Sequence, residues 1–177
     1  MESKRIPLER LTRIDPADFA VFGEIIGQTM QSPLEDFPWV AYWTHHVDID
    51  FAGSSVDFGL LHCRKHDGPV LMESHAGTRE TFLPLGDSSV FLLAPPNSDH
   101  SGPDLLGLRA FLMDSTLGVA LHKGIWHRPP WPISHQGARF ALLRTGELVD
   151  KTAALNLQIR VVLEDEDLPV SPTTIPL

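Results

Sequence analysis

The apolar residues of this chain fall in short runs that end at clusters of Gly, Pro, Asn, Asp and Ser. Runs of four to eight such residues between turn signals are typical of β-strands. We expect strands over residues 39–43, 56–63, 70–73, 80–85, 89–94, 106–114, 119–122, 140–144 and 155–163. About nine short strands at roughly ten-residue spacing predict a β-sandwich or β-barrel.

Two neighbouring runs, residues 81–85 and 90–94, are apolar at consecutive positions instead of alternating. Such runs fit either helix fragments or strands that are buried on both faces. Pro84 and the break at Gly86 favour two short buried strands, because proline and glycine interrupt a helix.

One helix is expected near the N-terminus. Asp15 offers a capping side chain, and Pro16 suits the first helical position. This helix would carry Phe19 and Phe22, and also Ile25 if it continued past Gly23, which we expect to end or weaken it.

Composition favours one strand-rich globular domain. The 177 residues include 15 prolines and 13 glycines, and internal prolines break helices. We expect a single all-β domain over residues 1–177. A division into two similar halves, 1–66 and 67–177, is the alternative that this length allows.

Charge and cysteine content exclude several classes of protein. The net charge is −9, so the chain lacks the basic field that nucleic acids attract. Its single cysteine, Cys63, excludes an internal disulfide and any zinc site built from several cysteines. Neither an apolar run of the ~18 residues that a membrane span needs nor a secretory leader is found, so no membrane association and a cytoplasmic location are expected.

Histidines and carboxylates gather in two segments of the chain. Glu73 and His75 are two residues apart, so on a strand they share one face. A turn after His75 would bring Glu80 back on the neighbouring strand. His127 follows a lysine-glycine turn in the second segment. In a small barrel these four side chains can meet in the mouth.

The two segments resemble the two motifs of the cupin jelly roll, in which a histidine pair and an acid precede a Pro-x-Gly-type turn and a final histidine follows a glycine turn. Glu73 stands where the first histidine of the pair is usual. Residues 73–130 are more closely similar to the ureidoglycolate lyase family, a branch of the cupins. The matching pieces are Glu73-x-His75, Phe82-Leu-Pro-Leu-Gly86, Phe91-Leu-Leu-Ala-Pro95, Pro103-Asp-Leu-x-x-Leu-Arg109-Ala-Phe111, Gly118-Val-x-x-His122-x-x-x-Trp126-His127-x-Pro129 and the opening segment 16–26.

The resemblance implies a cupin-type antiparallel β-barrel or jelly roll with a short N-terminal helix. It also implies a lyase that breaks the C–N bond of ureidoglycolate, or of a related small ureido- or hydroxy-carboxylate, into glyoxylate and urea, as in purine degradation through allantoin. Such chemistry needs a base, an acid and a cation for the substrate carboxylate. The candidate catalytic residues are His75, Glu80, His122 and His127, and the candidate substrate-binding residues are Lys123, Arg109 and Trp126.

A divalent metal ion is compatible with the same residues, and the sequence leaves open whether one binds. Imidazole and carboxylate side chains together suit such an ion, and the candidate ligands are Glu73, His75, Glu80 and His127. Without a metal, we expect a neutral histidine to act as the base and a carboxyl group kept protonated by burial or by a second acid to act as the acid.

Two other classes of function stay open at this point. One is a non-catalytic cupin that binds a small acid or sugar, and the other is a metal-dependent cupin isomerase or dioxygenase. Structural interpretations also compete for single residues: Arg109 as an outward-facing arginine, Trp126 as a packing residue and Cys63 as a small buried hydrophobe.

Assembly is the last expectation. Jelly-roll sheets leave edges that proteins cover or pair, and we expect a homodimer whose interface uses the N-terminal segment, the His45-His46 pair and the proline-rich C-terminal end. The expected partner of the barrel mouth is a small-molecule carboxylate substrate.

Overall fold

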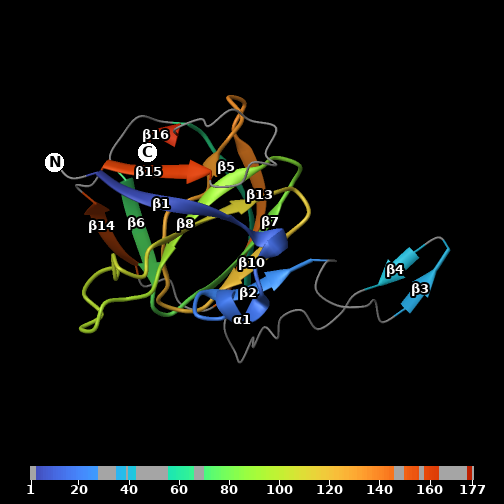
Figure 1. Ribbon diagram of the computed structural model, residues 1–177. Coiled ribbons are helices and arrows are strands. Elements are labelled where there is room, and N and C mark those ends of the chain that lie inside the picture. The colour runs from blue at the N-terminus through green and yellow to red at the C-terminus, as the bar shows by residue number, and fades with distance from the viewer. Residues whose placement is uncertain are drawn as a thin grey trace.

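A computed structural model of the chain describes residues 3–27, 35–38, 40–42, 56–65, 70–145, 150–155, 158–163 and 175–176. Two β-sheets face each other across a buried core, and a short helix lies at one end (Figure 1). The all-β, cupin-type fold that the sequence predicts is therefore confirmed.

The larger sheet runs in the order β14-β6-β11-β8-β9-β1-β15-β16, with β12 paired to β8. Its strands are β1 (Ser3–Arg10), β6 (Val70–His75), β8 (Ser89–Ala94), β9 (Arg109–Met113), β11 (Trp126–His127), β12 (Trp131–Pro132), β14 (Asp150–Leu155), β15 (Gln158–Leu163) and β16 (Ile175–Pro176). Strand β1 is the exception to the antiparallel arrangement, because it lies parallel to both β9 and β15.

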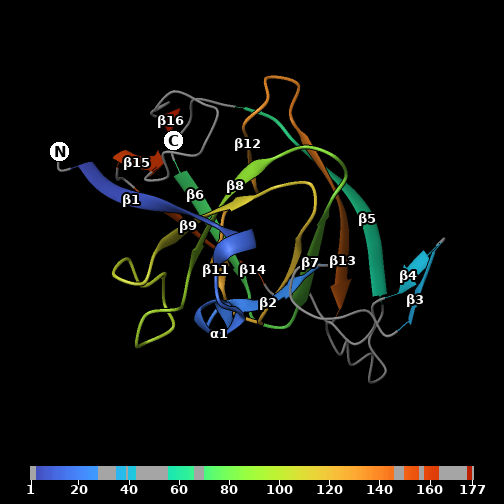
Figure 2. The same ribbon diagram turned by 45° about the vertical axis from the view of Figure 1, so that its right-hand side comes forward.

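The smaller sheet runs in the order β2-β10-β7-β13-β5. Its strands are β2 (Gly23–Ile26), β5 (Val56–Cys63), β7 (Arg79–Pro84), β10 (Gly118–Leu121) and β13 (Ala138–Thr145), and a separate hairpin joins β3 (Glu35–Phe37) to β4 (Val40–Tyr42). Strand β5 lies beside β13 in both views of the molecule (Figure 2). Strands from residues 1–66 pair with strands from residues 67–177 in both sheets, so the two halves are interleaved and we keep the single-domain division.

The single α-helix of the described residues, α1 (Pro16–Phe19), follows a 3₁₀ turn, η1 (Leu11–Arg13). The Asp15 side chain accepts a hydrogen bond from the Ala17 amide at 2.9 Å, as expected for a cap. The expectation for Ile25 is wrong, since it lies on strand β2. The chain extends after Phe22 because Gly23 lies directly against β10: a Cβ on Gly23 would be 2.0 Å from the carbonyl oxygen of Ala120.

Most predicted strands are present, and the differences have simple causes. The strand expected over 155–163 is β15, which begins at Gln158, whereas Leu155 is the last residue of the preceding strand β14. Several strands are not predicted, since they are polar in part, continue a helix pattern or are only two or three residues long; these are β1, β2, β3, β11, β12, β14 and β16. The His45-His46 pair and most of the proline-rich end lie outside the described residues.

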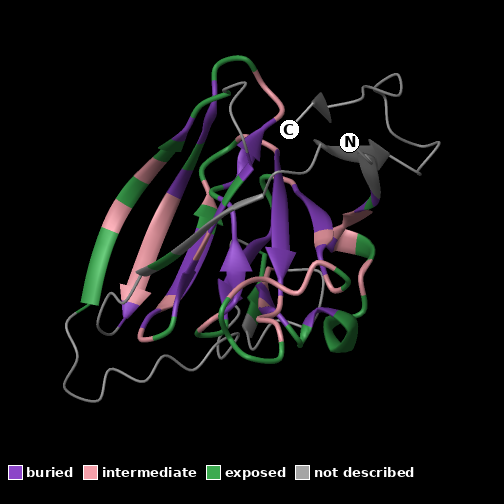
Figure 3. Ribbon diagram, turned by 90° about the vertical axis from the view of Figure 1, so that its left-hand side faces the viewer, coloured by how far each residue is buried: buried purple, intermediate pink, exposed green. Residues whose placement is uncertain are grey.

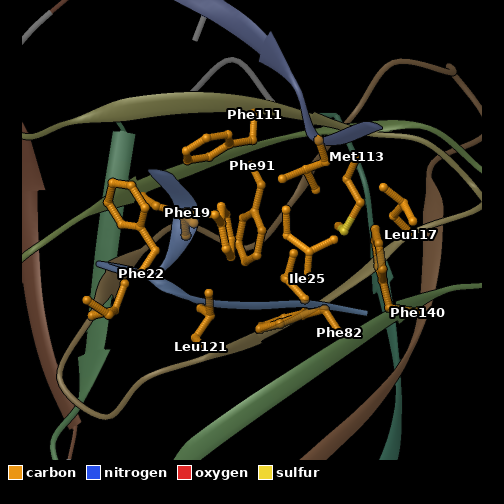
Figure 4. Packing of buried hydrophobic residues seen from close by; sticks show 14 of the residues in the cluster. Phe19, Phe22, Ile25, Phe82, Phe91, Phe111, Met113, Leu117, Leu121 and Phe140 are labelled. Carbon is orange, nitrogen blue, oxygen red and sulfur yellow. The ribbon is translucent and has the colours of Figure 1, made fainter. Parts of the chain in front are cut away.

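The main core fills the space between the two sheets (Figure 4). Aromatic rings meet edge to face in it: the centroids of Phe82 and Phe91 are 5.0 Å apart, and those of Phe19 and Phe111 are 5.2 Å apart. A fully buried side chain of this size stabilises the fold by roughly 1.5–3 kcal/mol. Phe19 of helix α1 therefore covers one end of the core with its ring.

A second apolar cluster lies on the other face of β8 and β9. Phe91 and Leu93 belong to the main core, whereas Leu92 and Ala94 belong to the second cluster. Strand β8 is buried along its whole length, which explains its run of consecutive apolar residues. In Figure 3 the buried strands stand between more exposed outer elements, and the exposed strand at the left is β5.

Candidate functional site

Strand register places three of the candidate residues on the inner face of the larger sheet. His127 on β11 pairs with Glu73 on β6, so the two residues are direct neighbours across the sheet. His75 shares a face with Glu73 because side chains alternate along a strand. Glu80 comes from β7 of the smaller sheet. The site is thus assembled from two sheets that face each other.

The four side chains lie within contact of one another. His127 Nε2 is 3.0 Å from Glu80 Oε2 and 3.6 Å from Glu73 Oε1. His75 Nε2 is 3.5 Å from the same Glu80 oxygen, and the two imidazole rings have centroids 5.3 Å apart. Glu80 is therefore the residue that both imidazoles approach.

The cluster is withdrawn from solvent. His127, Glu80 and His75 are buried, whereas the Glu73 side chain is 37% exposed. The edges of the Phe82 and Phe91 rings pack against the His127 ring. A recess with a volume of about 10 Å³ borders the cluster and is lined by His75, Thr78, Glu80, Leu121, His122, Ile125 and His127. This volume is about that of one water molecule.

Burial and charge act in opposite directions on the two central groups. Burial alone would lower the pKa of His127, but its hydrogen bond to Glu80, the charges of Glu80 and Glu73 and the carbonyl of Ile125 outweigh burial and raise the pKa. Burial alone would raise the pKa of Glu80, but the hydrogen bond and charge of His127, with the charges of His75 and Arg144, lower it. An imidazolium and a carboxylate are the protonation states that this pair favours.

These directions differ from the acid–base roles expected from the sequence. The expected acid is a carboxyl group kept protonated by burial or by a second acid. The lowered pKa of Glu80 favours the carboxylate instead, and the raised pKa of His127 favours the imidazolium. The reason is that Glu80 faces two imidazoles rather than a second acid.

The same side chains suit a divalent metal ion. One donor atom each from Glu73, His75 and His127 lie within 4.8 Å of one another. The Nδ1 atom of His127 is 3.2 Å from the Ile125 carbonyl oxygen, and a proton donated there leaves Nε2 directed at the carboxylates. A ligand histidine that donates its other N–H to a carbonyl is a frequent feature of metal centres. The donor set and its support therefore fit such an ion.

His122 and Lys123 lie on the turn between β10 and β11 with exposed side chains, and His122 lines the rim of the recess. His122 Nε2 is 3.0 Å from the carbonyl oxygen of Ala20, beside helix α1. The Gly124 amide donates to the His75 carbonyl oxygen at 3.0 Å, and its φ of +81° is one that glycine adopts freely. This bond fixes the rim against the strand that carries His75.

The structure does not bring Arg109 or Trp126 to the recess. Arg109 lies in the same row of the larger sheet as His127, but Leu93 stands between them, which separates the two backbones by roughly 10 Å. Its guanidinium donates to Glu9 through Nε at 2.7 Å and to the Asp18 carbonyl at 3.0 Å. These contacts hold β9 to β1 and to the helix, so their role is structural.

Trp126 precedes His127 on β11 and therefore points to the opposite face of the sheet. It is almost fully buried in the second apolar cluster. The expectation that Trp126 walls the substrate pocket is wrong for this reason.

Arg144 is a site residue that the sequence does not reveal. It pairs with Glu80 across β13 and β7, and its charge contributes to the lowered pKa of Glu80. Its Nε donates to Asp57 at 3.0 Å. Counting two-residue steps from Phe140 puts Arg144 on the core-facing side, but only the strand order places it beside Glu80.

Within the described residues, no helix has both the length and the apolar character needed to cross a membrane.

A family model and individual relatives both match this chain, and they carry the same family description. A model of the ureidoglycolate lyase family matches residues 3–166. The ureidoglycolate lyase of Burkholderia cepacia is 27% identical over 132 residues, which are 70% of this chain and 72% of that protein. The ureidoglycolate lyase of Pseudomonas aeruginosa strain UCBPP-PA14 is 28% identical over 102 residues, 58% of this chain, and this match spans about half (56%) of that protein. The family model covers most of the sequence, and this chain therefore belongs to the ureidoglycolate lyase family.

Proposed function

We propose that this chain is a ureidoglycolate lyase, which breaks the C–N bond of ureidoglycolate to give glyoxylate and urea. The observation that carries the proposal is the buried contact between His127 and Glu80 at 3.0 Å, with His75 beside it. Family membership supports the choice of substrate.

The reaction needs one proton to leave and one to arrive. Removal of the hydroxyl proton lets the oxygen form the aldehyde of glyoxylate while the C–N electron pair moves to nitrogen. That nitrogen takes up a proton and leaves as urea. Neither water nor an oxidant is consumed, so an acid and a base in one pocket are sufficient.

The protonation states of the cluster suggest which residue does what. His127, whose pKa is raised, would give its proton to the leaving nitrogen. Glu80 would hold that proton on His127 in the resting enzyme and would stabilise the imidazolium. His75 is the second imidazole of the cluster and would take the hydroxyl proton, since histidine is the most frequent general base in enzymes.

Cations border the cluster on two sides, where a substrate carboxylate would need one. Lys123 stands exposed at the rim, and Arg144 lies across from Glu80. We assign the first contact with the substrate to Lys123, because it is exposed and directly follows His122, which lines the recess. His122 would position this rim through its contact with Ala20.

A metal ion held by Glu73, His75 and His127 would, when bound, bring the hydroxyl and carboxylate oxygens of the substrate together and polarise them. Glu80 would then add a negative charge beside both imidazoles.

One preparation tests the proposed function. The purified protein is assayed for glyoxylate release from ureidoglycolate with and without a chelator, and its metal content is measured. Glyoxylate release supports the lyase. An inert protein that binds small acids would support the non-catalytic cupin, and an inert protein with a tightly held iron or manganese would support the isomerase or dioxygenase.

We also propose that the chain forms a homodimer and works in the cytoplasm. Among the described strands, β5 ends the smaller sheet. It presents Phe58 and Leu60, 71% and 70% exposed, on its outer face. Exposed apolar residues on an edge strand favour pairing with another chain. Light scattering of the wild type and of a Phe58→Ser, Leu60→Ser variant tests the dimer, which the double substitution should weaken.

A further inference from the structure

A second pocket opens away from the His–Glu recess, with a volume of about 280 Å³. It is lined by Leu61, His62, Cys63, Arg64, Leu71, Arg128, Pro129, Pro130 and Trp131, and it shares no lining residue with the recess. Leu71 is four residues before His75 on β6, which separates the two by roughly 13 Å along the strand. The volume is close to the lower end of small-molecule pockets, roughly 300 Å³.

The charge of this pocket differs from that of the whole chain. Two arginines line it, Arg64 and Arg128, and none of its described lining residues is an acid. The chain as a whole has a net charge of −9. A positive pocket on such a protein attracts anions, although the average field of the surface repels them.

Arg128 is held in a fixed orientation. Its guanidinium carbon is 4.0 Å from the centroid of the Trp131 ring, a cation–π stack, and only 4% of the residue is exposed. Burial lowers its pKa to about 10, and the Cys63 thiol opposes this effect. The guanidinium is therefore still charged at neutral pH. Burial raises the pKa of Cys63 to about 11, so the thiol adds no negative charge.

Apart from His62, the remaining lining is apolar and partly open. Leu71 is 54% exposed, and Pro129 is also exposed, whereas Pro130 and Trp131 are buried. An apolar wall beside a guanidinium suits a ligand with a charged head and a hydrocarbon body. The planar guanidinium fork matches the two oxygens of a carboxylate.

We propose that this pocket binds a small organic carboxylate with an apolar body, at a site separate from the His–Glu recess. The carboxylate would lie against Arg128 and Arg64, and the hydrocarbon would cover Leu71 and the two prolines. The proposal does not depend on the lyase activity.

Calorimetric titration of the full-length protein with hexanoate, and with hexanamide as the uncharged analogue, tests this site. We expect hexanoate to bind. Hexanamide should bind more weakly by a factor of roughly ten or more, since a charge-assisted hydrogen bond is lost. Arg64→Gln should weaken hexanoate binding, whereas Lys65→Gln, which removes the neighbouring exposed charge, should not.

Leu71→Glu places a carboxylate on the exposed wall and should abolish binding without removing a buried group. Its matched control is Leu106→Glu, at a leucine that is 94% exposed and lies outside the pocket. No binding of hexanoate at millimolar concentration would overturn the proposal. So would equal affinities for the two probes, or equal affinities in Leu71→Glu and Leu106→Glu.

Discussion

His127 and Glu80 are 47 residues apart in the sequence, yet His127 Nε2 and Glu80 Oε2 lie 3.0 Å apart across the two sheets. Each residue lies on a different sheet, β11 for His127 and β7 for Glu80. The contact therefore exists only when the two sheets are packed against each other, and it links folding to the chemistry of the site. 

The first prediction concerns stability as a function of pH, measured by urea unfolding in the presence of a chelator. The pKa of His127 is raised in the folded state above its ordinary value of 6.5. This histidine therefore adds to the free energy of unfolding below pH 6.5, and its contribution is lost as the pH rises through the folded-state pKa. The pKa of Glu80 is lowered in the folded state below its ordinary value of 4.5. This carboxylate therefore adds to the free energy of unfolding above pH 4.5, and its contribution is lost as the pH falls through the folded-state pKa. Wild type should therefore exceed Glu80→Gln in stability most clearly between pH 4.5 and 6.5. A constant difference at all pH values would contradict the assigned pair.

The second prediction separates the two cations that the sequence proposes for the substrate carboxylate. Lys123→Ala removes an exposed rim charge, so KM for ureidoglycolate should rise roughly tenfold with little loss of stability. Arg109→Gln removes the contacts with Glu9 and Asp18, so it should lower stability and leave KM unchanged. Steady-state kinetics and thermal unfolding of both variants provide the check. A higher KM in Arg109→Gln alone would reverse the assignment.

The third prediction concerns the close approach of β2 to β10. Gly23→Ala would place a Cβ 2.0 Å from the Ala120 carbonyl oxygen, and we expect a loss of about 1–3 kcal/mol in the free energy of unfolding. Gly59→Ala on β5 is the matched control, because its Cβ would meet no atom within 4 Å. Chemical denaturation compares the two, and equal stabilities would show that β2 does not depend on this contact.

Much of the fold could be predicted from local patterns. The bounds expected for β5 and β8 are those found, because both are apolar runs between turn residues. The helix start at Asp15 and Pro16 can also be predicted, since capping depends on residues that are close in the sequence. Strand β1 is not predicted, because its residues are partly polar and its pairing with β9 and β15 depends on distant segments.

The site could be predicted only in part, for the same reason. Spacing along β6 gives the shared face of Glu73 and His75. The partner of Arg109 and the neighbour of Arg144 depend on strand order, which a single sequence does not contain. The protonation of Glu80 likewise depends on which groups the other sheet brings near it.

The most direct test of the central claim is the rate of glyoxylate release from ureidoglycolate by wild type, His127→Gln and His135→Gln. His135 is exposed and lies outside the recess, so its variant is the control. If His127 transfers the proton, its replacement should lower kcat by about 10²–10⁴-fold, while circular dichroism and the His135→Gln rate stay at wild-type values. A His127→Gln protein that is folded and turns over ureidoglycolate at the wild-type rate would contradict the account.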